Sequence, residues 1–384
     1  MIKNNRRFLV LTELFLPTKG GTAVWFDEVY RRLGGKGIHI VTAAVPGDAE
    51  YDRTHPNSVH RLPLQYLNWI RPASLGIYLK FFFKALTLSL SDRFEAVHAG
   101  RVLPEGWVGW FVARIICKPL VIYAHGEEIT TWSRHPRRLK AMRFAYRHAD
   151  VVIANSDFTR GELLKLAVPA ERIRLIHPGV NLERFHPGYE TTDLRQSIGI
   201  GESGKLILSV GRLSRRKGFD QVIQSLPKLR QQGLDVHYAI IGIGEDEEYL
   251  WQLVQEHGVA ERVHLLGHVA MEDLPRWYCA ADVFAMPNRE INGDTEGFGM
   301  VFVEAAACGT PSIAGFAGGT GAAVRDGETG LRVDGADGAK VAEALRRLLT
   351  DAELANRLAR QGLERAQQEL GWEQVAEKTG RLFR

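Results

Sequence analysis

The sequence has 384 residues, which suits two or three domains of about 150 residues each. Hydrophobic residues make up 45% and charged residues 24% of it, a balance that is typical of globular proteins and excludes a disordered chain. With only three cysteines, a disulfide-stapled scaffold is excluded and a reducing compartment is favoured.

The net charge of +4 is unevenly distributed along the chain. Residues 1–190 contain 27 Lys and Arg against 17 Asp and Glu, a net charge of +10, whereas the remainder contains 22 against 28, a net charge of −6. The two halves therefore bind different partners, or one half faces an anionic surface. We find neither a signal peptide nor the roughly 18 uncharged apolar residues of a membrane helix. These features predict a cytoplasmic protein with at most peripheral membrane contact.

Short apolar runs alternate with helical patterns along almost the whole sequence. This alternation predicts parallel sheets with helices on both faces, arranged as two α/β domains in succession. Between them lies the Pro- and Gly-punctuated stretch 177–188, which is typical of a linker. The predicted strands are 8–14, 38–43, 96–99, 120–124, 151–154 and 173–177 in the first series, and 206–210, 236–241, 263–266, 283–286, 312–314 and 331–333 in the second.

Two motifs of the first series follow predicted strands, where open α/β sheets bind their ligands. Gly20 and Gly21 lie between the first strand and a helix, so the backbone can approach a ligand and the helix N-terminus favours an anion. A tight strand–helix turn would explain the same glycines. His125 ends another strand and is followed by Gly126; it can exchange a proton near neutral pH, although a single histidine is often structural.

A basic cluster and a pair of glutamates distinguish the second series. Four basic residues lie within Arg212–Lys217, flanked by glycines at the end of a strand; this pattern favours a diphosphate site over a solvated loop. Glu296 lies in a glycine-rich loop, and Glu304 lies in the apolar helix that follows. Carboxylates there can accept hydrogen bonds from sugar or ribose hydroxyls. A helix-dipole effect would explain Glu296 but not Glu304.

Together these motifs resemble the retaining nucleotide-sugar glycosyltransferases of glycosyltransferase family 4. The resemblance covers nearly the whole chain, and the loop before Glu296 is similar to that of bacterial mannosyltransferases that use GDP-mannose. It implies an α/β GT-B fold, in which two Rossmann-like, doubly wound domains face a cleft. Residues 1–187, joined by a C-terminal helix at 371–384, would bind the acceptor, and residues 188–370 would bind the nucleotide-sugar donor.

The resemblance also implies roles for individual residues. Arg212 and Lys217, together with the Gly20–Gly21 loop, would bind the donor diphosphate. His125 and Glu296 would be the catalytic residues beside the donor sugar.

Further donor contacts follow from the same resemblance. Glu304 would bind the ribose hydroxyls, and Glu296 the sugar hydroxyls. Backbone amides beside the sugar would come from Phe298, Gly299 and Met300. Many members have a proline and a glutamate in the next glycine-rich loop; this chain lacks both at 318–322, which leaves the amides of Gly319 and Thr320 as candidate phosphate contacts.

The family's chemistry is a front-face substitution in which the leaving diphosphate helps to deprotonate the acceptor, so electrostatic stabilisation is the main requirement. The resemblance implies that no metal or other cofactor is needed. The sequence, which has no Asp-x-Asp motif and no His/Cys cluster with zinc spacing, agrees with this expectation. The expected reaction moves a hexose from a GDP- or UDP-linked donor to a glycan or lipid-linked acceptor in bacterial polysaccharide, lipopolysaccharide or glycolipid synthesis. The alternatives are a nucleotide-sugar 2-epimerase, a phosphorylase and a non-catalytic carbohydrate-binding protein.

Residues 61–93 combine lysines with aromatic and aliphatic residues in a helical pattern typical of a helix in a membrane interface. Lys80 and Lys84 lie on one stripe of this helix. A second basic group lies within 134–147 and suits anionic lipid headgroups, at about 1 kcal/mol per basic residue. A core-packed helix and an ordinary solvated face are the alternative interpretations. We therefore expect peripheral contact with an anionic membrane, on its inner face, and find no motif for nucleic acid.

Overall fold

The structure is a computed structural model that describes residues 6–64, 75–201 and 203–382. It divides into two compact units, Met1–Pro178 with Trp372–Arg384, and Gly179–Gly371. The division at Pro178 precedes the position expected from the sequence, 187. The reason is local: Val180 N donates a hydrogen bond to Leu370 O at 2.8 Å, and Phe185 contacts the Tyr278 ring at 5.9 Å. The first residues of the linker therefore belong to the second unit.

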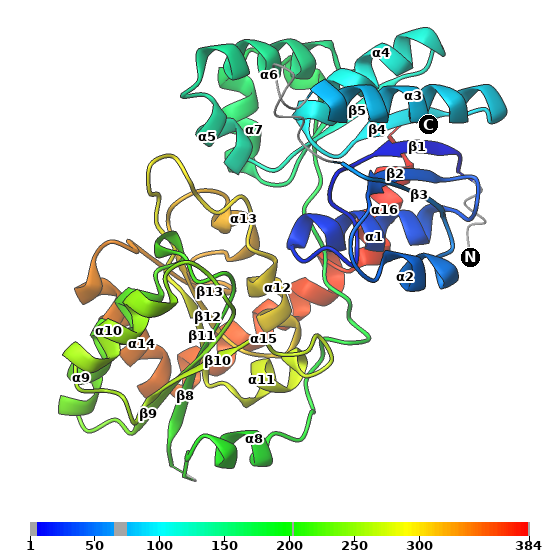
Figure 1. The fold of residues 1–384 in the computed structure, drawn as a ribbon. Coiled ribbons are helices and arrows are strands. Elements are labelled where there is room, and N and C mark those ends of the chain that lie inside the picture. Colours follow the sequence, from blue (N-terminus) through cyan, green and yellow to red (C-terminus); the bar gives the residue numbers. More distant parts are fainter. Residues whose placement is uncertain (1–5, 65–74, 202, 383–384) are drawn as a thin grey trace. The chain divides into compact units, whose positions relative to one another are not determined.

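The first unit is built around a seven-stranded sheet in the order β3-β2-β1-β4-β5-β6-β7 (Figure 1). Every pairing is parallel. The strands are β1 (Phe8–Leu11), β2 (His39–Ala43), β3 (Ser58–Leu62), β4 (Ala96–Ala99), β5 (Leu120–Ala124), β6 (Val151–Ala154) and β7 (Ile173–Leu175). The helices are α1 (Gly21–Leu33), α2 (Asp48–Thr54), α3 (Leu75–Ser91), η1 (Val102–Gly106), α4 (Trp107–Ile115), α5 (Glu127–Trp132), α6 (Pro136–His148), α7 (Asp157–Lys165), η2 (Ala170–Arg172) and α16 (Trp372–Gly380).

The second unit has a six-stranded parallel sheet in the order β10-β9-β8-β11-β12-β13. Its strands are β8 (Lys205–Val210), β9 (Val236–Ile241), β10 (Val263–Gly267), β11 (Val283–Met286), β12 (Ser312–Gly315) and β13 (Gly330–Val333). Its helices are α8 (Thr192–Ser197), η3 (Arg215–Lys217), α9 (Phe219–Gln231), α10 (Glu247–Glu256), α11 (Leu274–Ala280), α12 (Met300–Ala307), α13 (Thr320–Ala323), α14 (Gly338–Thr350) and α15 (Ala352–Glu369).

Both sheets reverse their strand order at one point, beside β1 in the first unit and beside β8 in the second. At such a switch point the loops that leave neighbouring strands diverge, and open α/β sheets bind ligands there. In the first unit these loops follow β1 and β4; in the second they follow β8 and β11. The two doubly wound α/β units predicted from the sequence are confirmed.

Helix α3 has two different apolar faces. One face packs into the core through Ile77, Phe81, Ala85 and Leu88. The other leaves apolar side chains in solvent, including Phe83 at 60% and Leu90 at 84% exposure. The core-packing and surface interpretations of the segment 61–93 therefore each apply to one face of α3. Residues 61 and 62 of the segment belong to β3, and residues 65–74 lie outside the described residues.

Among the described residues, we find no helix that is both long enough and apolar enough to cross a membrane.

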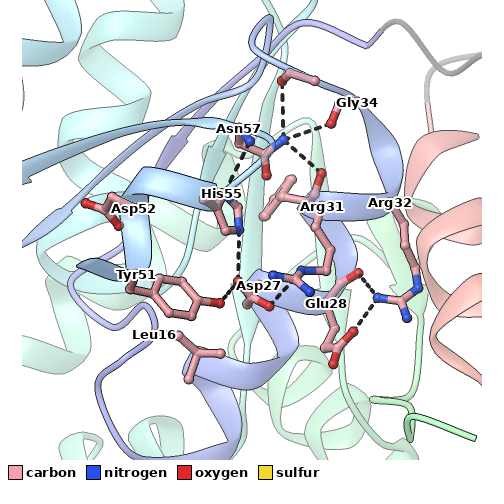
Figure 2. A network of polar contacts seen from close by, with 12 residues as sticks. Leu16, Asp27, Glu28, Arg31, Arg32, Gly34, Tyr51, Asp52, His55 and Asn57 are labelled. Carbon is pink, nitrogen blue, oxygen red and sulfur yellow. Dashed lines mark hydrogen bonds and ion pairs between the residues drawn. The ribbon is translucent and has the colours of Figure 1, made fainter. Parts of the chain in front are cut away.

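A buried polar network fixes helix α1, whose first residue follows the glycine loop. Asp27 is 2% exposed, and its carboxylate accepts hydrogen bonds from His55 Nε2 at 2.9 Å and from the Tyr51 hydroxyl. Arg31 Nε lies 3.0 Å from the other carboxylate oxygen. Figure 2 shows Asp27 between these three side chains, which come from α1, α2 and the residue after α2. Because the carboxylate has partners on several elements, it holds α1 against the α2–β3 connection.

Candidate functional site

The second unit places two cations on one buried carboxylate. Lys217 Nζ lies 2.5 Å and Arg216 Nη1 2.9 Å from Glu296 Oε2, and the Lys217 and Glu296 side chains are only 11% and 14% exposed. The cations belong to η3, which follows β8, and Glu296 lies in the loop after β11. Burial alone would raise the pKa of Glu296, but Lys217 and Arg216 outweigh it and lower the pKa to about 2. Glu296 is therefore an anion and a hydrogen-bond acceptor at neutral pH.

A tight turn precedes Glu296. The Ile291 and Asp294 backbones exchange hydrogen bonds at 3.0 and 2.9 Å, and the two residues between them have positive φ angles, 52° at Asn292 and 78° at Gly293. Asparagine followed by glycine is the preferred pair for such a turn. The turn directs Asp294 toward η3, where its Oδ1 lies 3.1 Å from Arg216 Nε.

Glu304 lies in α12, as the sequence predicted, and has a partner from α11. The Tyr278 hydroxyl donates a hydrogen bond to Glu304 Oε2 at 2.8 Å. Burial raises the pKa of Glu304, and this hydrogen bond partly offsets the effect. One carboxylate oxygen is thereby fixed, which leaves the group suited to accept from a ligand hydroxyl.

The loop before α12 requires glycine at position 299. Gly299 caps the helix with a φ of 89°, and a Cβ atom there would lie 2.7 Å from the Phe302 ring. Phe298 is 3% exposed, and Met300 is half-buried at the start of the helix. The first amides of a helix have no partner within it, so the amides around Gly299 and Met300 are suited to ligand contacts.

Two other predicted phosphate contacts have local partners. Arg212 is 71% exposed and pairs with Glu245 at 2.8 Å, a surface ion pair that a ligand can displace at little cost. The amide of Gly319 donates to Glu296 O at 2.7 Å. The expectation that this amide is available to a phosphate was wrong, because the amide closes the loop around Glu296.

His125 lies in the first unit, immediately after β5, and is 7% exposed. Its Nε2 lies 2.8 Å from Gly100 O, and because a carbonyl only accepts, Nε2 must carry the proton. The Trp25 and Phe26 rings meet the imidazole edge-on at 5.7 and 6.1 Å. Burial lowers the pKa of His125, although Glu128 raises it in part. The ring is therefore neutral near pH 7, with Nδ1 as its acceptor.

Gly20 and Gly21 form the junction between the β1 loop and α1. Gly20 has a φ of 132°, and a Cβ atom built on it meets nothing within 4 Å. The first turn of α1 has no acidic residue and no side-chain cap. The glycines therefore leave open space at a helix N-terminus, which is the arrangement that favours an anion.

Glu105 is a buried acid that the sequence interpretation did not single out. It lies in η1 after β4, is fully buried, and its Oε1 accepts from Glu13 N at 2.9 Å. Burial raises its pKa to about 7, against smaller opposing effects of the Glu13 amide and Arg101. Its position after a strand at the switch point was a signal in the sequence.

The structure thus brings together Lys217 and Glu296, and Glu304 with Tyr278, while Arg212 is exposed and pairs with Glu245. Arg216, Asp294 and Tyr278 are neighbours that the sequence interpretation missed. Arg216 stood within the recognised basic cluster; Tyr278 had no local signal. The described residues contain no group of three or more His, Cys, Asp or Glu side chains arranged to hold a metal ion.

Two Rossmann-like units with these loops at their switch points define the GT-B class of glycosyltransferases. Residues 19–184 match the family described as Glycosyltransferase Family 4, and residues 190–365 match Glycosyl transferases group 1. The chain is 32% identical over 350 residues to a GDP-mannose-dependent α-(1-6)-phosphatidylinositol monomannoside mannosyltransferase of Mycolicibacterium smegmatis, covering 89% of each chain. The Mycobacterium tuberculosis protein of the same name is also 32% identical, with 98% of each chain covered. The chain belongs to glycosyltransferase family 4.

Solved structures support the fold. Sucrose-phosphate synthase from Thermosynechococcus elongatus matches with a TM-score of 0.82 at 26% identity, covering 98% of each chain. HepE from Anabaena, solved in complex with UDP and glucose, matches with a TM-score of 0.82 at 22% identity and the same coverage. The predicted GT-B fold and the prediction of a hexosyltransferase enzyme are confirmed.

Proposed function

We propose that this enzyme is a retaining hexosyltransferase that takes its sugar from a nucleotide diphosphate donor bound to the second unit. The observation that carries the proposal is the buried Glu296 carboxylate with Lys217 and Arg216 against it. A carboxylate that stays ionised accepts from sugar hydroxyls, and a cation beside it stabilises the negative charge of a departing diphosphate. GDP-mannose is the first donor to test, because the mycobacterial relatives are named for its use.

Each site residue then has a task in the transfer. Lys217 and Arg212 stabilise the diphosphate as the bond to the sugar breaks. Glu304 accepts from the ribose hydroxyls while Tyr278 fixes its orientation. His125 presents a neutral imidazole from the first unit, and the open helix terminus at Gly20–Gly21 adds a second anion-binding element. We propose that these groups suffice without a metal ion, so EDTA should leave the rate unchanged.

The first unit is proposed to bind the acceptor, a glycan or a lipid-linked sugar in a bacterial polysaccharide, lipopolysaccharide or glycolipid pathway. The phosphatidylinositol mannoside in the names of the mycobacterial relatives favours a lipid-linked acceptor. Such an acceptor lies in a membrane, so the enzyme must work at the membrane surface.

A surface of the first unit suits this location. Helices α3 and α4 pack against each other and expose large apolar side chains at 45 to 84%; these are Leu79, Phe83, Leu90, Phe111 and Ile115. Helix α6, which packs near α4, and the turn before it add exposed cations, without a single acid between residues 134 and 147; these are Arg134 in the turn and Arg137, Arg138, Lys140, Arg143 and Arg147 in the helix. We call these residues the α3–α6 surface. Apolar residues beside unopposed cations favour an anionic lipid interface, and the protein is proposed to bind peripherally to the inner face of the cell membrane.

The reaction class is tested by incubating the enzyme with GDP-mannose or UDP-glucose, with and without a lipid-linked acceptor, and analysing products by NMR. A retaining transferase gives a glycoside with the anomeric configuration of the donor, and only when acceptor is present. Donor converted to its 2-epimer without acceptor would instead identify an epimerase, and donor bound but never consumed would identify a carbohydrate-binding protein.

A further inference from the structure

Glu296 has two cationic partners, Lys217 and Arg216. The proposed function requires only Lys217 to turn toward the donor diphosphate. Lys217 is a single point charge on a flexible stem. When a diphosphate arrives, Lys217 must share its charge between the phosphate oxygens and Glu296. The Glu296 carboxylate would then lose part of its contact with Lys217, which orients it, just when the donor sugar binds.

Arg216 is held in a way that Lys217 is not. Its guanidinium spans two carboxylates, with Nε 3.1 Å from Asp294 Oδ1 and Nη1 2.9 Å from Glu296 Oε2. The side chain is 14% exposed. A planar fork that is engaged on two edges has a fixed orientation. Asp294 thereby fixes Arg216, and Arg216 fixes Glu296.

The backbone of this arrangement is also anchored. The Arg216 carbonyl accepts from Arg289 N at 2.8 Å, and the Arg289 guanidinium forms a two-point pair with Asp220 at 2.9 and 2.6 Å. Asp220 is 3% exposed, so this pair is shielded from solvent. At Gly218 a Cβ atom would lie 2.2 Å from Pro287 O, which shows that the loops after β8 and β11 are in backbone contact. The two loops therefore support each other's position.

We infer that Arg216, locked by Asp294, is a positioning residue that holds Glu296 in its sugar-binding orientation while Lys217 engages the diphosphate. This inference rests on the proposed function. It separates two tasks within one basic cluster, because Lys217 binds the phosphates, and Arg216 determines how well the sugar is bound through Glu296. Arg216 itself does not contact the donor phosphates.

This division of tasks predicts a selective defect. The affinity of Arg216→Met is measured by titration calorimetry for GDP and GDP-mannose, and for UDP and UDP-glucose. With whichever pair the wild type binds, the variant should bind the nucleotide sugar at least tenfold more weakly and the nucleoside diphosphate within twofold of wild type. Asp294→Asn should show the same selective loss, about threefold, because Arg216 keeps its contact with Glu296. Arg346→Met, which removes an arginine from the surface pair with Glu343, is the matched control and should change neither affinity.

Coupling to Glu296 completes the test. Glu296→Gln should show the same selective loss as Arg216→Met, and the double variant should be no weaker than Glu296→Gln alone. Equal weakening of nucleoside diphosphate and nucleotide sugar in Arg216→Met would place Arg216 on the phosphates and overturn the inference, as would wild-type affinity for both. Additive effects in the double variant would also overturn it. If Arg216→Met is unfolded by circular dichroism, Asp294→Asn carries the same comparison. A wild type that binds none of the four ligands would refute the proposed donor instead.

Discussion

Lys217 Nζ lies 2.5 Å from Glu296 Oε2, although the two residues are 79 positions apart in the sequence. The contact joins the loop after β8 to the loop after β11, at the strand-order reversal of the second sheet. The pKa of Glu296, about 2, follows from this pair and from Arg216. The two parts of the site that the sequence singled out separately, the basic cluster and the first glutamate, are therefore one charged unit.

Removing either member of this pair should stop transfer. Lys217→Ala leaves the buried Glu296 with one cation fewer. Glu296→Ala removes the carboxylate that accepts hydrogen bonds from the donor sugar. We expect each variant to lose at least 100-fold in kcat/KM, about 2.7 kcal/mol of transition-state stabilisation, while circular dichroism remains that of wild type. The measurement is initial transfer rate against donor concentration, with Arg346→Met as the unaffected control. Wild-type turnover in either variant would show that the site is assigned wrongly.

Glu105 predicts a dependence of stability on pH. Its pKa is raised to about 7 in the folded protein by burial, from about 4.5 in the unfolded chain, so between these values the folded state holds a proton that the unfolded state has lost. The free energy of unfolding therefore falls by roughly 3 kcal/mol at most as pH rises through this range, and it levels off above it. Glu105→Gln cannot ionise. Urea unfolding at about pH 5 and pH 8 should show the variant gaining roughly this amount over wild type; a constant difference would contradict the raised pKa.

The buried network around Asp27 predicts that this residue contributes to stability and not directly to the reaction. Asp27→Ala leaves His55, Tyr51 and Arg31 without their common partner (Figure 2). Loss of one member of a buried ion pair costs about 3 kcal/mol, so the urea midpoint of the first unit should fall. Glu50→Ala, an exposed acid on neighbouring α2, is the control and should change stability by less than about 0.5 kcal/mol. Equal effects of the two substitutions would show that the network contributes nothing.

The α3–α6 surface predicts selective binding to anionic vesicles. In co-sedimentation, wild type should bind phosphatidylglycerol-containing vesicles and release them as salt screens the charges. Leu79→Ser with Phe83→Ser removes exposed apolar contacts and should weaken binding several-fold, as should Arg137→Ser with Arg138→Ser. Trp251→Ser, an exposed apolar residue of the second unit at 40%, is the control. Equal and negligible binding to anionic and neutral vesicles would refute the membrane proposal.

The fold could be predicted from the sequence because parallel strands covered on both faces appear as continuous apolar runs. Strand β6, Val151–Ala154, is buried throughout and could be predicted from the sequence for this reason. Strand β3 was missed because Ser58–Leu62 is an edge strand, half-buried along its length, and its sequence, SVHRL, has only two apolar residues and no regular alternation. Short mixed runs of this kind do not differ from loops until a neighbouring strand is known.

A site residue could be predicted only where its neighbours in the sequence made it stand out. Glu304 stood out as a charge in an apolar helix, but its partner Tyr278 comes from another helix and had no signal. The role of Arg216 depends on where Asp294 lies after its turn, which is a tertiary fact. The Gly319 amide was misread because a backbone amide gives no indication in the sequence of whether another carbonyl already uses it.

The central claim is that the charged unit of Lys217, Arg216 and Glu296 binds a nucleotide sugar. Thermal unfolding with GDP-mannose, UDP-glucose and ADP-glucose, for wild type and Glu296→Gln, tests it most directly. A ligand at 100 times its dissociation constant adds about 2.7 kcal/mol to the stability of the folded state. We predict that at least one nucleotide sugar raises the wild-type midpoint, and that Glu296→Gln loses about half of this rise or more. No rise with any of the three sugars, or an equal rise in the variant, would contradict the claim.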